Sequence, residues 1–366
     1  MSLYARLGRD DPTPWLLASG EPQARWIALT QIPLEVPATP AQIAAAHVEV
    51  LADARTQRLL DMLPDWDVPA DVSGHNKPEL ATNVLDLLAT FGVTADDDPR
   101  IPRLLGQMLS HTDADGRFLA YGVQRSGPPV WGTVHCDTHA IADVAGRFGL
   151  GRDPRVLRAL QAAEGDLEAF DLGTAWGCRP DPATGFRGPG KASEPCPQAT
   201  LEALRAYSWL TPDERPAWLT DVAHTALEVW RQRGERKPYM MGHGRQFKTV
   251  KWPVAWYGAY EVTDTLARLP ETWRHSGADR RALAEIAACL LAYNVSGDGT
   301  VTPQSAFKGW EWLSVGDKTR PSPLATAMVW AGLAALETLA DEIVAVDVMR
   351  LASSKGGSGS PMPPRV

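Results

Sequence analysis

The chain has 366 residues, of which 44% are hydrophobic and 22% are charged, so it is long and apolar enough for one large folded domain or two ordinary ones. Its formal net charge of -8 argues against a basic surface that follows a phosphate backbone, and nucleic acid is not expected as a partner. The first residues lack the basic start and apolar run of a signal peptide, and no window approaches the ~18 apolar residues of a membrane-spanning helix. A cytoplasmic location is therefore expected.

Periodic apolar residues predict helices along most of the chain, with no convincing run of strands. In chain order, the segments expected to be helical are 14–32, 37–53, 76–101, 136–156, 196–230, 254–273 and 322–340. They form about six helix pairs, separated by loops rich in proline and glycine. The sequence thus predicts an all-α protein with a single domain over residues 1–342. A C-terminal extension covers 343–366, and its linker-like part, 353–366, is expected to be disordered.

Two of these segments repeat each other. Residues 76–101 and 136–156 both contain Phe-Gly-apolar followed by Asp-Pro-Arg-apolar, with an offset of 57 residues. In each copy, one helix is expected to end at a glycine and the next to begin at an aspartate that caps it. These residues are Gly92 and Asp98 in the first copy and Gly149 and Asp153 in the second.

Repeated helix pairs with Asp-Gly turns, such as HTDADGRF at 111–118 and SGDGTV at 296–301, resemble the α/α toroid of the terpenoid cyclase and protein prenyltransferase superfamily. The turns are similar to the Gln-and-Trp turn motifs of squalene–hopene cyclases, although Phe118 and Val301 stand where tryptophans are usual. The repeat pattern covers most of residues 10–342, and the chain is also similar to bacterial squalene-cyclase-like proteins. The resemblance implies an (α/α)6 toroid whose central cavity is lined by the N-terminal ends of its inner helices.

The sequence HCDTH, from His135 to His139, lies at the start of a helix that the resemblance makes an inner one. One interpretation is structural, with Asp137 or Thr138 capping the helix by accepting a backbone hydrogen bond. Another compares the motif with the acidic motif of class II terpene cyclases. That resemblance implies that Asp137 is the catalytic proton donor and that His135 or His139 adjusts the protonation of Asp137. In this comparison His135 replaces the first Asp of the motif.

A third interpretation concerns the cysteines, which number four and are too few for a disulfide scaffold in a chain of this length. Cys136, Cys178 and Cys196 fall in loops or helix starts of consecutive repeats, and with one histidine they would complete a tetrahedral zinc site. The candidate histidines are His135, His139 and His243. The alternative is that these cysteines are small buried apolar residues. No cofactor is firmly indicated, and zinc is the one that would fit.

A second unusual segment, 236–257, mixes cations, aromatic residues and glycines without helical periodicity until Trp256. It is expected to be a loop over a binding site, because cations bind anionic groups and aromatic rings bind cations or apolar chains. Residues 307–323 have a similar composition. The candidate substrate-binding residues are Lys237, Tyr239, His243, Arg245, Lys248, Lys251, Trp252, Trp256, Tyr257 and Trp310. The alternative is a solvated basic loop that its aromatic residues anchor.

Three functions therefore stay open. The first is a cyclase- or isomerase-like enzyme that acts on a small, partly apolar molecule by acid-initiated chemistry at Asp137. The second is a zinc–thiolate enzyme of the transferase or lyase type that uses the clustered cysteines. The third is a non-catalytic binding or scaffold toroid. The oligomeric state has no signal in the sequence, and two further histidines, His75 and His111, are each expected at the surface.

Overall fold

A computed structural model of the protein describes residues 1–68, 74–122, 127–235 and 244–351. The described residues are mostly helical and include seventeen α-helices and six strands of only two or three residues, which confirms the predicted all-α class. Internal contacts divide the chain into two compact units. Unit 1 consists of Met1–Arg58, Thr90–Val93 and Val229–Val366, and unit 2 of Leu59–Ala89 and Thr94–Glu228. The predicted tail 353–366 lies outside the described residues, and the single domain over 1–342 stays a prediction.

Unit 1 is built from helices of both ends of the chain. Its helices are α1 (Leu3–Arg6), α2 (Thr13–Leu17), α3 (Pro22–Gln31), α4 (Pro40–Ala52), α12 (Gly244–Lys248), α13 (Ala259–Ala267), α14 (Pro270–Trp273), α15 (Gly277–Asn294), α16 (Pro323–Ala334) and α17 (Ala340–Val344). The strands β5 (Lys251–Trp252) and β6 (Ser305–Ala306) pair in parallel. The described residues also contain short 3-10 helices. One spans Pro212–Glu214 in unit 2, and the others span Gln232–Gly234, Ser314–Gly316 and Glu337–Leu339 in unit 1.

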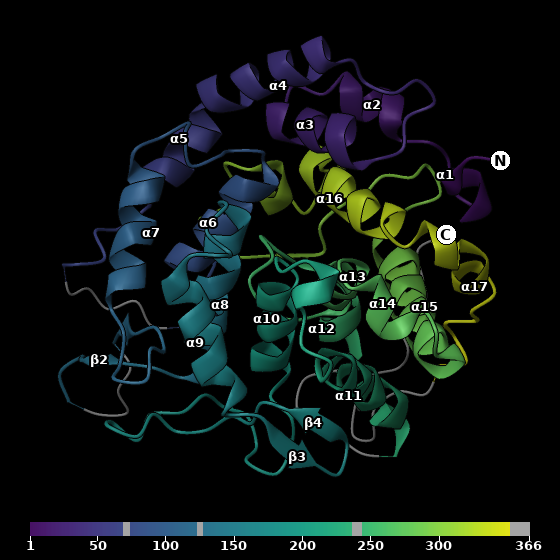
Figure 1. The fold of residues 1–366 in the computed structure, drawn as a ribbon. Coiled ribbons are helices and arrows are strands. Elements are labelled where there is room, and N and C mark those ends of the chain that lie inside the picture. The colour runs from purple at the N-terminus through teal and green to yellow at the C-terminus, as the bar shows by residue number, and fades with distance from the viewer. Residues whose placement is uncertain (69–73, 123–126, 236–243, 352–366) are drawn as a thin grey trace. The chain divides into compact units, whose positions relative to one another are not determined.

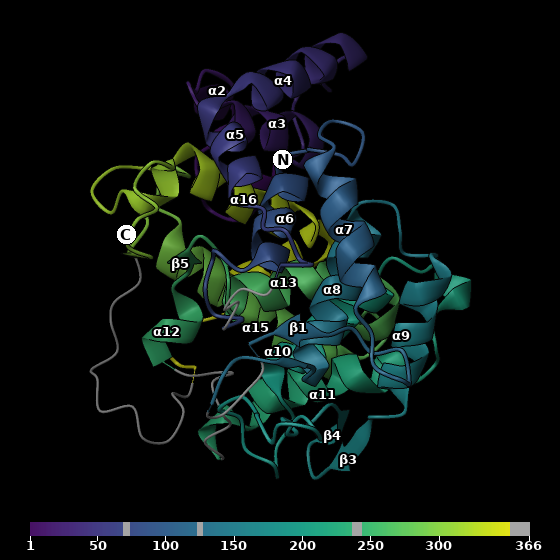
Figure 2. The same cartoon turned by 90° about the vertical axis from the view of Figure 1, so that its left-hand side faces the viewer.

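The helix α16 forms much of the core of unit 1. It packs against α3 and α13, and its residues Leu324 to Trp330 are all buried, as expected for a helix that is apolar on every face. The helices α2, α3 and α4 lie together (Figure 2), and α3 contacts both of the others. The helix pair predicted at 14–32 and 37–53 therefore forms, with the first segment divided into α2 and α3.

Unit 2 contains α7 (Arg100–Ser110), α8 (His135–Arg147), α9 (Pro154–Glu164) and α10 (Pro197–Tyr207). Two antiparallel pairs join strands β1 (Ala120–Tyr121) and β2 (Trp131–Gly132), and strands β3 (Glu168–Phe170) and β4 (Gly173–Ala175). Helices α5 (Ala54–Asp61), α6 (Ala81–Thr90) and α11 (Leu219–Arg231) contain the residues at which the chain passes from one unit to the other.

The helices α8 and α10 are both largely enclosed in unit 2. The helix α8 packs against α9 and α10 (Figure 1), and every residue from Asp137 to Gly146 is buried. The first eight of the eleven residues of α10, from Pro197 to Leu204, are buried as well. Because both helices are enclosed from their first turns onward, polar residues in those turns are held inside the unit, where a polar group without a partner is costly.

The repeat predicted from the sequence has the helix ends that were expected. Gly92 and Gly149 both have positive φ, at 83° and 85°, which is the backbone conformation that favours glycine after a helix. Asp153 is the N-cap of α9 and accepts from the N–H of Arg155. Asp98 makes the equivalent bond to the N–H of Arg100 at 2.9 Å. The N-cap prediction is therefore confirmed for Asp153, whereas the N-cap residue of α7 is Pro99 and Asp98 lies one residue before it.

The two Asp-Gly turns share a local geometry. In unit 2, Thr112 bridges to Phe118, and Gly116 between them has a φ of 105°. In unit 1, Val295 bridges to Val301, and the intervening Gly299 has a φ of 78°. Each turn is thus a tight reversal that requires a residue tolerant of positive φ, and glycine meets that requirement.

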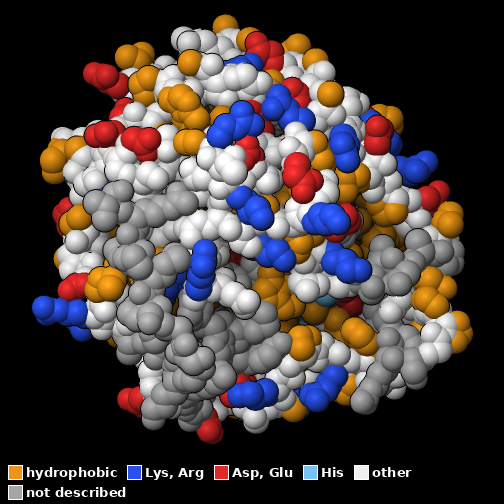
Figure 3. Space-filling model, turned by 180° about the vertical axis from the view of Figure 1, so that it is seen from behind, with side chains coloured by type: hydrophobic (Ala, Val, Ile, Leu, Met, Phe, Trp, Pro, Cys, Tyr) orange, Lys and Arg blue, Asp and Glu red, His pale blue; other side chains and the backbone are white. Residues whose placement is uncertain are grey.

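Among the helices that the structure describes, no single one is long and apolar enough to cross a membrane. Only the bent pair of Pro323–Ala334 with Glu337–Val344 passes that test together, across a bend of 70°, and α16 is buried within unit 1. On the face drawn in Figure 3, Lys and Arg side chains gather around the middle of the view, with Asp and Glu side chains among them and toward the edge. Charges of both signs are therefore present on this face.

Candidate functional site

The first turn of α8 carries the polar residues of the HCDTH motif. Val134 is the N-cap residue of this helix, and the Oδ2 atom of Asp137 accepts a hydrogen bond from the Val134 N–H at 3.0 Å. Asp137 is only 7% exposed. It does stabilise the helix end, as the structural interpretation expects, but from the third helical position rather than from the N-cap.

The second oxygen of Asp137 contacts a histidine from another part of the sequence. His75 lies before α6, and its Nε2 atom is 2.6 Å from Asp137 Oδ1. The expectation that His75 lies at the surface is wrong, because its side chain is only 16% exposed. Burial of an imidazole is tolerated here because a carboxylate accepts its N–H, which is a strong hydrogen bond in a water-poor environment.

The other ring nitrogen of His75 faces a second acidic residue. His75 Nδ1 lies 3.6 Å from Oε1 of Glu202 on α10, and Gln198 donates a hydrogen bond to the same oxygen. Within the described residues, His75 Nδ1 and Glu202 Oε2 are buried without a hydrogen-bond partner. His75 and Glu202 therefore each keep one buried polar atom that could bind a ligand.

Cys136 completes this cluster. One ring nitrogen of His75, the sulfur of Cys136 and a carboxylate oxygen of Glu202 all lie within 4.8 Å of one another. We call His75, Cys136, Asp137 and Glu202 the candidate metal centre. Ligands of a tetrahedral zinc ion are about 3.5 Å apart, given zinc–ligand bonds of about 2.0–2.3 Å, so a small contraction of this cluster would reach that spacing.

The electrostatics of the candidate metal centre link its members. Burial disfavours the charged form of His75, but the neighbouring Cys136 and Asp137 outweigh it and raise the pKa of His75 well above 6.5. Burial raises the pKa of the Cys136 thiol to about 11, while His75 acts in the opposite direction. When no metal ion is bound, the protonated imidazole of His75 is therefore the positive charge that lies beside Asp137.

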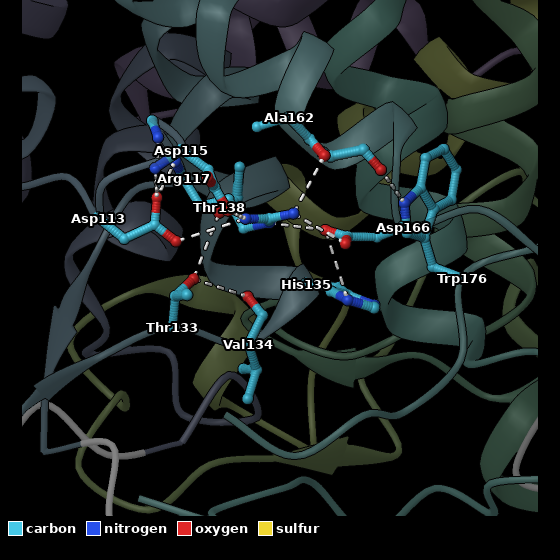
Figure 4. Close-up of polar contacts among 12 residues, drawn as sticks. Asp113, Asp115, Arg117, Thr133, Val134, His135, Thr138, Ala162, Asp166 and Trp176 are labelled. Carbon is cyan, nitrogen blue, oxygen red and sulfur yellow. Dashed lines mark hydrogen bonds and ion pairs between the residues drawn. The ribbon is translucent and has the colours of Figure 1, made fainter. Parts of the chain in front are cut away.

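His135, which was predicted to adjust Asp137, faces a different group of residues (Figure 4). Its Nδ1 atom lies 3.1 Å from the carbonyl oxygen of Gly177, and its Nε2 atom is 3.6 Å from Asp166 Oδ2. Asp166 in turn accepts two hydrogen bonds from the guanidinium of Arg117, at 2.8 and 2.9 Å. Burial is the main cause that lowers the pKa of His135. His135 thus belongs to an ion-pair network that leads away from Asp137.

His139, the other predicted catalytic histidine, is packed in the core. It is 0% exposed, and its ring meets Trp176 edge-on with centroids 4.6 Å apart. Burial lowers the pKa of His139 to about 3, and within the described chain neither ring nitrogen has a hydrogen-bond partner. Of the three predicted catalytic residues, the structure places only Asp137 in the candidate metal centre.

Of the three cysteines predicted as zinc ligands, one lies in the candidate metal centre and the other two contact each other. Cys136 belongs to the candidate metal centre, whereas Cys178 and Cys196 contact each other through a hydrogen bond between their side chains. Cys196 is the N-cap residue of α10. All four cysteines of the chain are described, and they are free thiols. The structure therefore brings Cys136 together with His75 and Glu202, which the sequence did not indicate as ligands.

The predicted substrate-binding residues fall in unit 1 or outside the described residues. Lys237, Tyr239 and His243 lie in the part that the structure does not describe. The aromatic rings of Trp252, Tyr257 and Trp310 are buried, with at most 5% exposed. These three rings therefore contribute to the packing of unit 1, as in the interpretation in which aromatic residues anchor the segment.

The remaining candidates of this group make local contacts in unit 1. Lys248 places its ammonium 5.1 Å from the ring centre of Tyr293, and Lys251 lies 3.6 Å from that of Phe307. Further contacts join Arg245 to Gln304 and Trp256 to Tyr257. The ammonium groups of both lysines therefore lie over aromatic rings of the same chain, at distances typical of cation–π contacts.

Comparisons with known proteins give no relative for this chain. No protein-family model matches it, and the searches for similar curated proteins and for similar solved structures found no match.

Proposed function

We propose that unit 2 binds a zinc ion through His75, Cys136 and Glu202, and that the protein is a zinc-dependent enzyme. The observation that carries this proposal is the position of His75 between two carboxylates. Its Nε2 atom is held by Asp137 at 2.6 Å, and its Nδ1 atom lies toward Glu202 at 3.6 Å. An Asp that fixes the ring of a ligand histidine through its second nitrogen is the usual outer support of a zinc site.

The choice of zinc follows from the ligand types. A thiolate, an imidazole and a carboxylate suit zinc, whereas magnesium and calcium prefer oxygen ligands alone. Gln198 supports the set by donating a hydrogen bond to Glu202, which fixes one carboxylate oxygen. The thiol of Cys136 and the Nδ1 atom of His75 would each give up a proton on binding the ion.

Three protein ligands favour a catalytic site over a structural one, because structural zinc sites are closed by four protein ligands. A zinc ion held in this way supplies a Lewis acid that activates a thiol, a water molecule or a carbonyl group. Asp137 keeps its proton-accepting contact with His75 and orients the imidazole. The substrate in this proposal is a small molecule that enters unit 2 beside the first turns of α8 and α10.

The acid-initiated cyclase proposal receives less support from the same residues. A proton donor must hold its own proton, but both oxygens of Asp137 accept hydrogen bonds, one from His75 and one from the Val134 N–H. Both oxygens are thus engaged by groups of the chain, whereas a proton donor must present an O–H group to its substrate. The α/α toroid of that superfamily likewise stays a proposal, supported by the packing of consecutive helices such as α8 with α9.

Metal analysis of variants tests the zinc proposal. Full-length protein is produced without added zinc, dialysed and analysed by atomic emission, and about one zinc per chain is expected from the three protein ligands. His75→Ala, Cys136→Ser and Glu202→Gln should each lose most of the metal. Cys289→Ala, which removes a thiol in unit 1, is the matched control and should keep it.

Two outcomes would contradict the proposal. One is a wild-type protein that holds no zinc even after loading with excess metal and dialysis. The other is loss of zinc in Cys178→Ser with full retention in Glu202→Gln, which would assign the metal to the three cysteines. Circular dichroism of each variant shows whether the protein is folded, so that loss of metal is not confused with loss of structure.

The catalytic part of the proposal has its own measurement. Cobalt replaces zinc, and its thiolate-to-metal absorption reports the bond to Cys136. Adding a small thiol should change this absorption if a coordination position is open to substrate. A spectrum that does not respond, in a protein that holds cobalt tightly, would identify a closed structural site and would rule out direct catalysis by the metal.

A further inference from the structure

Cys178 and Cys196 form a second cluster of thiols in unit 2. Gly177 and Pro195 pair in an antiparallel bridge, and the N–H of Cys196 donates to the carbonyl oxygen of Trp176 at 2.7 Å. This pairing places the two cysteines on adjacent segments and brings their side chains into hydrogen-bond contact. Both are only partly buried as residues, so a small reagent can approach this cluster.

The sulfur of Cys178 rests on a glycine-rich loop. The N–H groups of Gly188 and Gly190 donate hydrogen bonds to it, and Arg187 adds a positive charge nearby. A Cβ atom at Gly190 would lie 2.7 Å from the Cys178 Cβ and 3.2 Å from its sulfur, and one at Gly188 would lie 3.2 Å from that sulfur. The close approach therefore requires glycine at Gly190 and favours it at Gly188. Converging N–H groups of this kind bind anions, here a thiolate.

The four cysteines consequently differ in reactivity. The hydrogen bond from Cys196 is the largest of the effects that lower the pKa of Cys178 to about 6, and it outweighs burial, which acts in the opposite direction. Burial raises the pKa of both Cys136 and Cys289 to about 11. The N–H groups of the glycine-rich loop and the charge of Arg187 thus favour the thiolate at Cys178 over the thiolate at Cys196, and a thiolate is the reactive form of cysteine.

We propose that Cys178 and Cys196 are a redox-active dithiol that reacts with hydroperoxides, with Cys178 as the attacking residue and Cys196 as the resolving one. The proposal does not depend on the zinc site. It rests on the contact between the two thiols, the cradle of N–H groups around Cys178, and the access that a small peroxide has to partly exposed residues.

The chemistry needs only the two cysteines and a peroxide. The Cys178 thiolate attacks one oxygen of hydrogen peroxide, the O–O bond breaks, and a sulfenic acid forms on Cys178 as hydroxide leaves. The Cys196 sulfur then attacks the Cys178 sulfur, so that an S–S bond forms and the S–O bond breaks. The departing hydroxide takes the proton of Cys196 as water. The thiolate and the thiol are oxidised to a disulfide, and one peroxide is reduced to one water and one hydroxide, which takes a proton from the solvent.

Peptide mapping tests this proposal on the full-length protein. Reduced protein is treated with one equivalent of hydrogen peroxide, its remaining thiols are alkylated, and it is digested with trypsin without reductant. Cleavage after Arg187 and Lys191 separates the two cysteines, so a disulfide between them joins two peptides. The joined pair should be the main product, about tenfold or more above any product that contains Cys289.

Variants identify the role of each thiol. Cys196→Ser should leave a sulfenic acid on Cys178 that dimedone traps, whereas Cys178→Ser should give neither the sulfenic acid nor the disulfide. Cys289→Ala is the matched control and should form the disulfide normally. Absence of the joined peptides in folded wild-type protein, or a disulfide between Cys136 and either partner as the main product, would overturn the proposal.

The pH dependence of alkylation gives a second readout that a merely structural pair would not show. The rate of reaction of Cys178 with iodoacetamide should rise with a midpoint near pH 6, because its pKa is lowered to about 6. Arg187→Gln removes a nearby positive charge and should move this midpoint upward. A wild-type midpoint above pH 8, where an ordinary cysteine titrates, would contradict the assignment.

Discussion

The Nε2 atom of His75 lies 2.6 Å from Oδ1 of Asp137, although 62 residues separate the two in the chain. This contact fixes the plane of the imidazole and leaves its Nδ1 atom facing Glu202. The same Asp137 accepts the Val134 N–H and so ties the histidine to the first turn of α8. One carboxylate thus serves both the helix end and the candidate metal centre.

Replacement of Asp137 by alanine should weaken zinc binding by about tenfold to a hundredfold without abolishing it, since such residues orient a ligand rather than bind the metal. It should also cost more than the roughly 1 kcal/mol of a lost helix-end hydrogen bond, because the enclosed imidazole of His75 loses its partner as well. Competition with a chelator of known affinity measures the first effect. Asp153→Ala is the control for the helix-end hydrogen bond, since it removes the cap of α9, and it should leave zinc affinity unchanged.

Two glycines at equivalent positions of the repeat should differ in their tolerance of alanine. At Gly92, with a φ of 83°, a Cβ would lie 2.1 Å from the ring of Trp26, whereas at Gly149 it would meet nothing within 4 Å. Gly149→Ala should cost about 1–2 kcal/mol for the left-handed backbone alone, and Gly92→Ala clearly more. Thermal midpoints of both variants measure the difference, and equal losses would contradict this account of Gly92.

His139 should make stability depend on pH. Its pKa is about 3 in the fold and 6.5 without burial, so below pH 6.5 the unfolded chain takes up a proton that the folded chain does not. The stabilising effect of the neutral ring is complete above pH 6.5 and is lost as the pH falls toward 3. His139→Phe should therefore lose less stability than the wild type between pH 6.5 and 4. Parallel profiles of thermal midpoint against pH would refute this.

An ion-pair network in unit 2 provides a further test. Asp86 Oδ1 lies 2.6 Å from Arg147 and 2.5 Å from Arg205, and both arginine side chains are only 13% exposed. Asp86→Asn should cost about 2 kcal/mol or more, because it removes a charge that pairs with two enclosed guanidinium groups, although Arg205 keeps its second pair with Asp143 at 3.1 Å. Arg350→Gln, which breaks an exposed pair, should cost less than about 1 kcal/mol. Similar losses in the two variants would show that the enclosure has no effect.

Local chemistry made much of the fold predictable. Gly92 and Asp98 mark helix ends because positive φ and N-capping each require particular residue types, and the same signals recur at Gly149 and Asp153. The strands were not predicted, since segments of two or three residues are too short for an alternating pattern to show. Whether the helix pairs close into a toroid depends on contacts between distant segments, which repeat spacing alone does not determine.

The candidate metal centre was predictable only in part. Asp137 and Cys136 stand out because they interrupt the repeat, and both belong to the cluster. His75 was missed because it precedes its helix and acquires its role from a partner far along the chain. Glu202 is a carboxylate within a helix that is buried on most sides, and a buried carboxylate requires a partner, but its helix also carries other polar residues, so the sequence signal was weak. His135 and His139 were predicted to act on Asp137 but contact other residues, because positions two residues away from Asp137 on a helix point in different directions.

X-ray absorption at the zinc edge of the purified full-length protein tests the central claim most directly. The ligand set of His75, Cys136 and Glu202 predicts one sulfur at about 2.3 Å, with the remaining ligands nitrogen or oxygen at about 2.0–2.2 Å. Cys136→Ser should remove the sulfur contribution, whereas Cys178→Ser should leave the spectrum unchanged. A first shell with three sulfur ligands would contradict the account and would place the metal on Cys136, Cys178 and Cys196 instead.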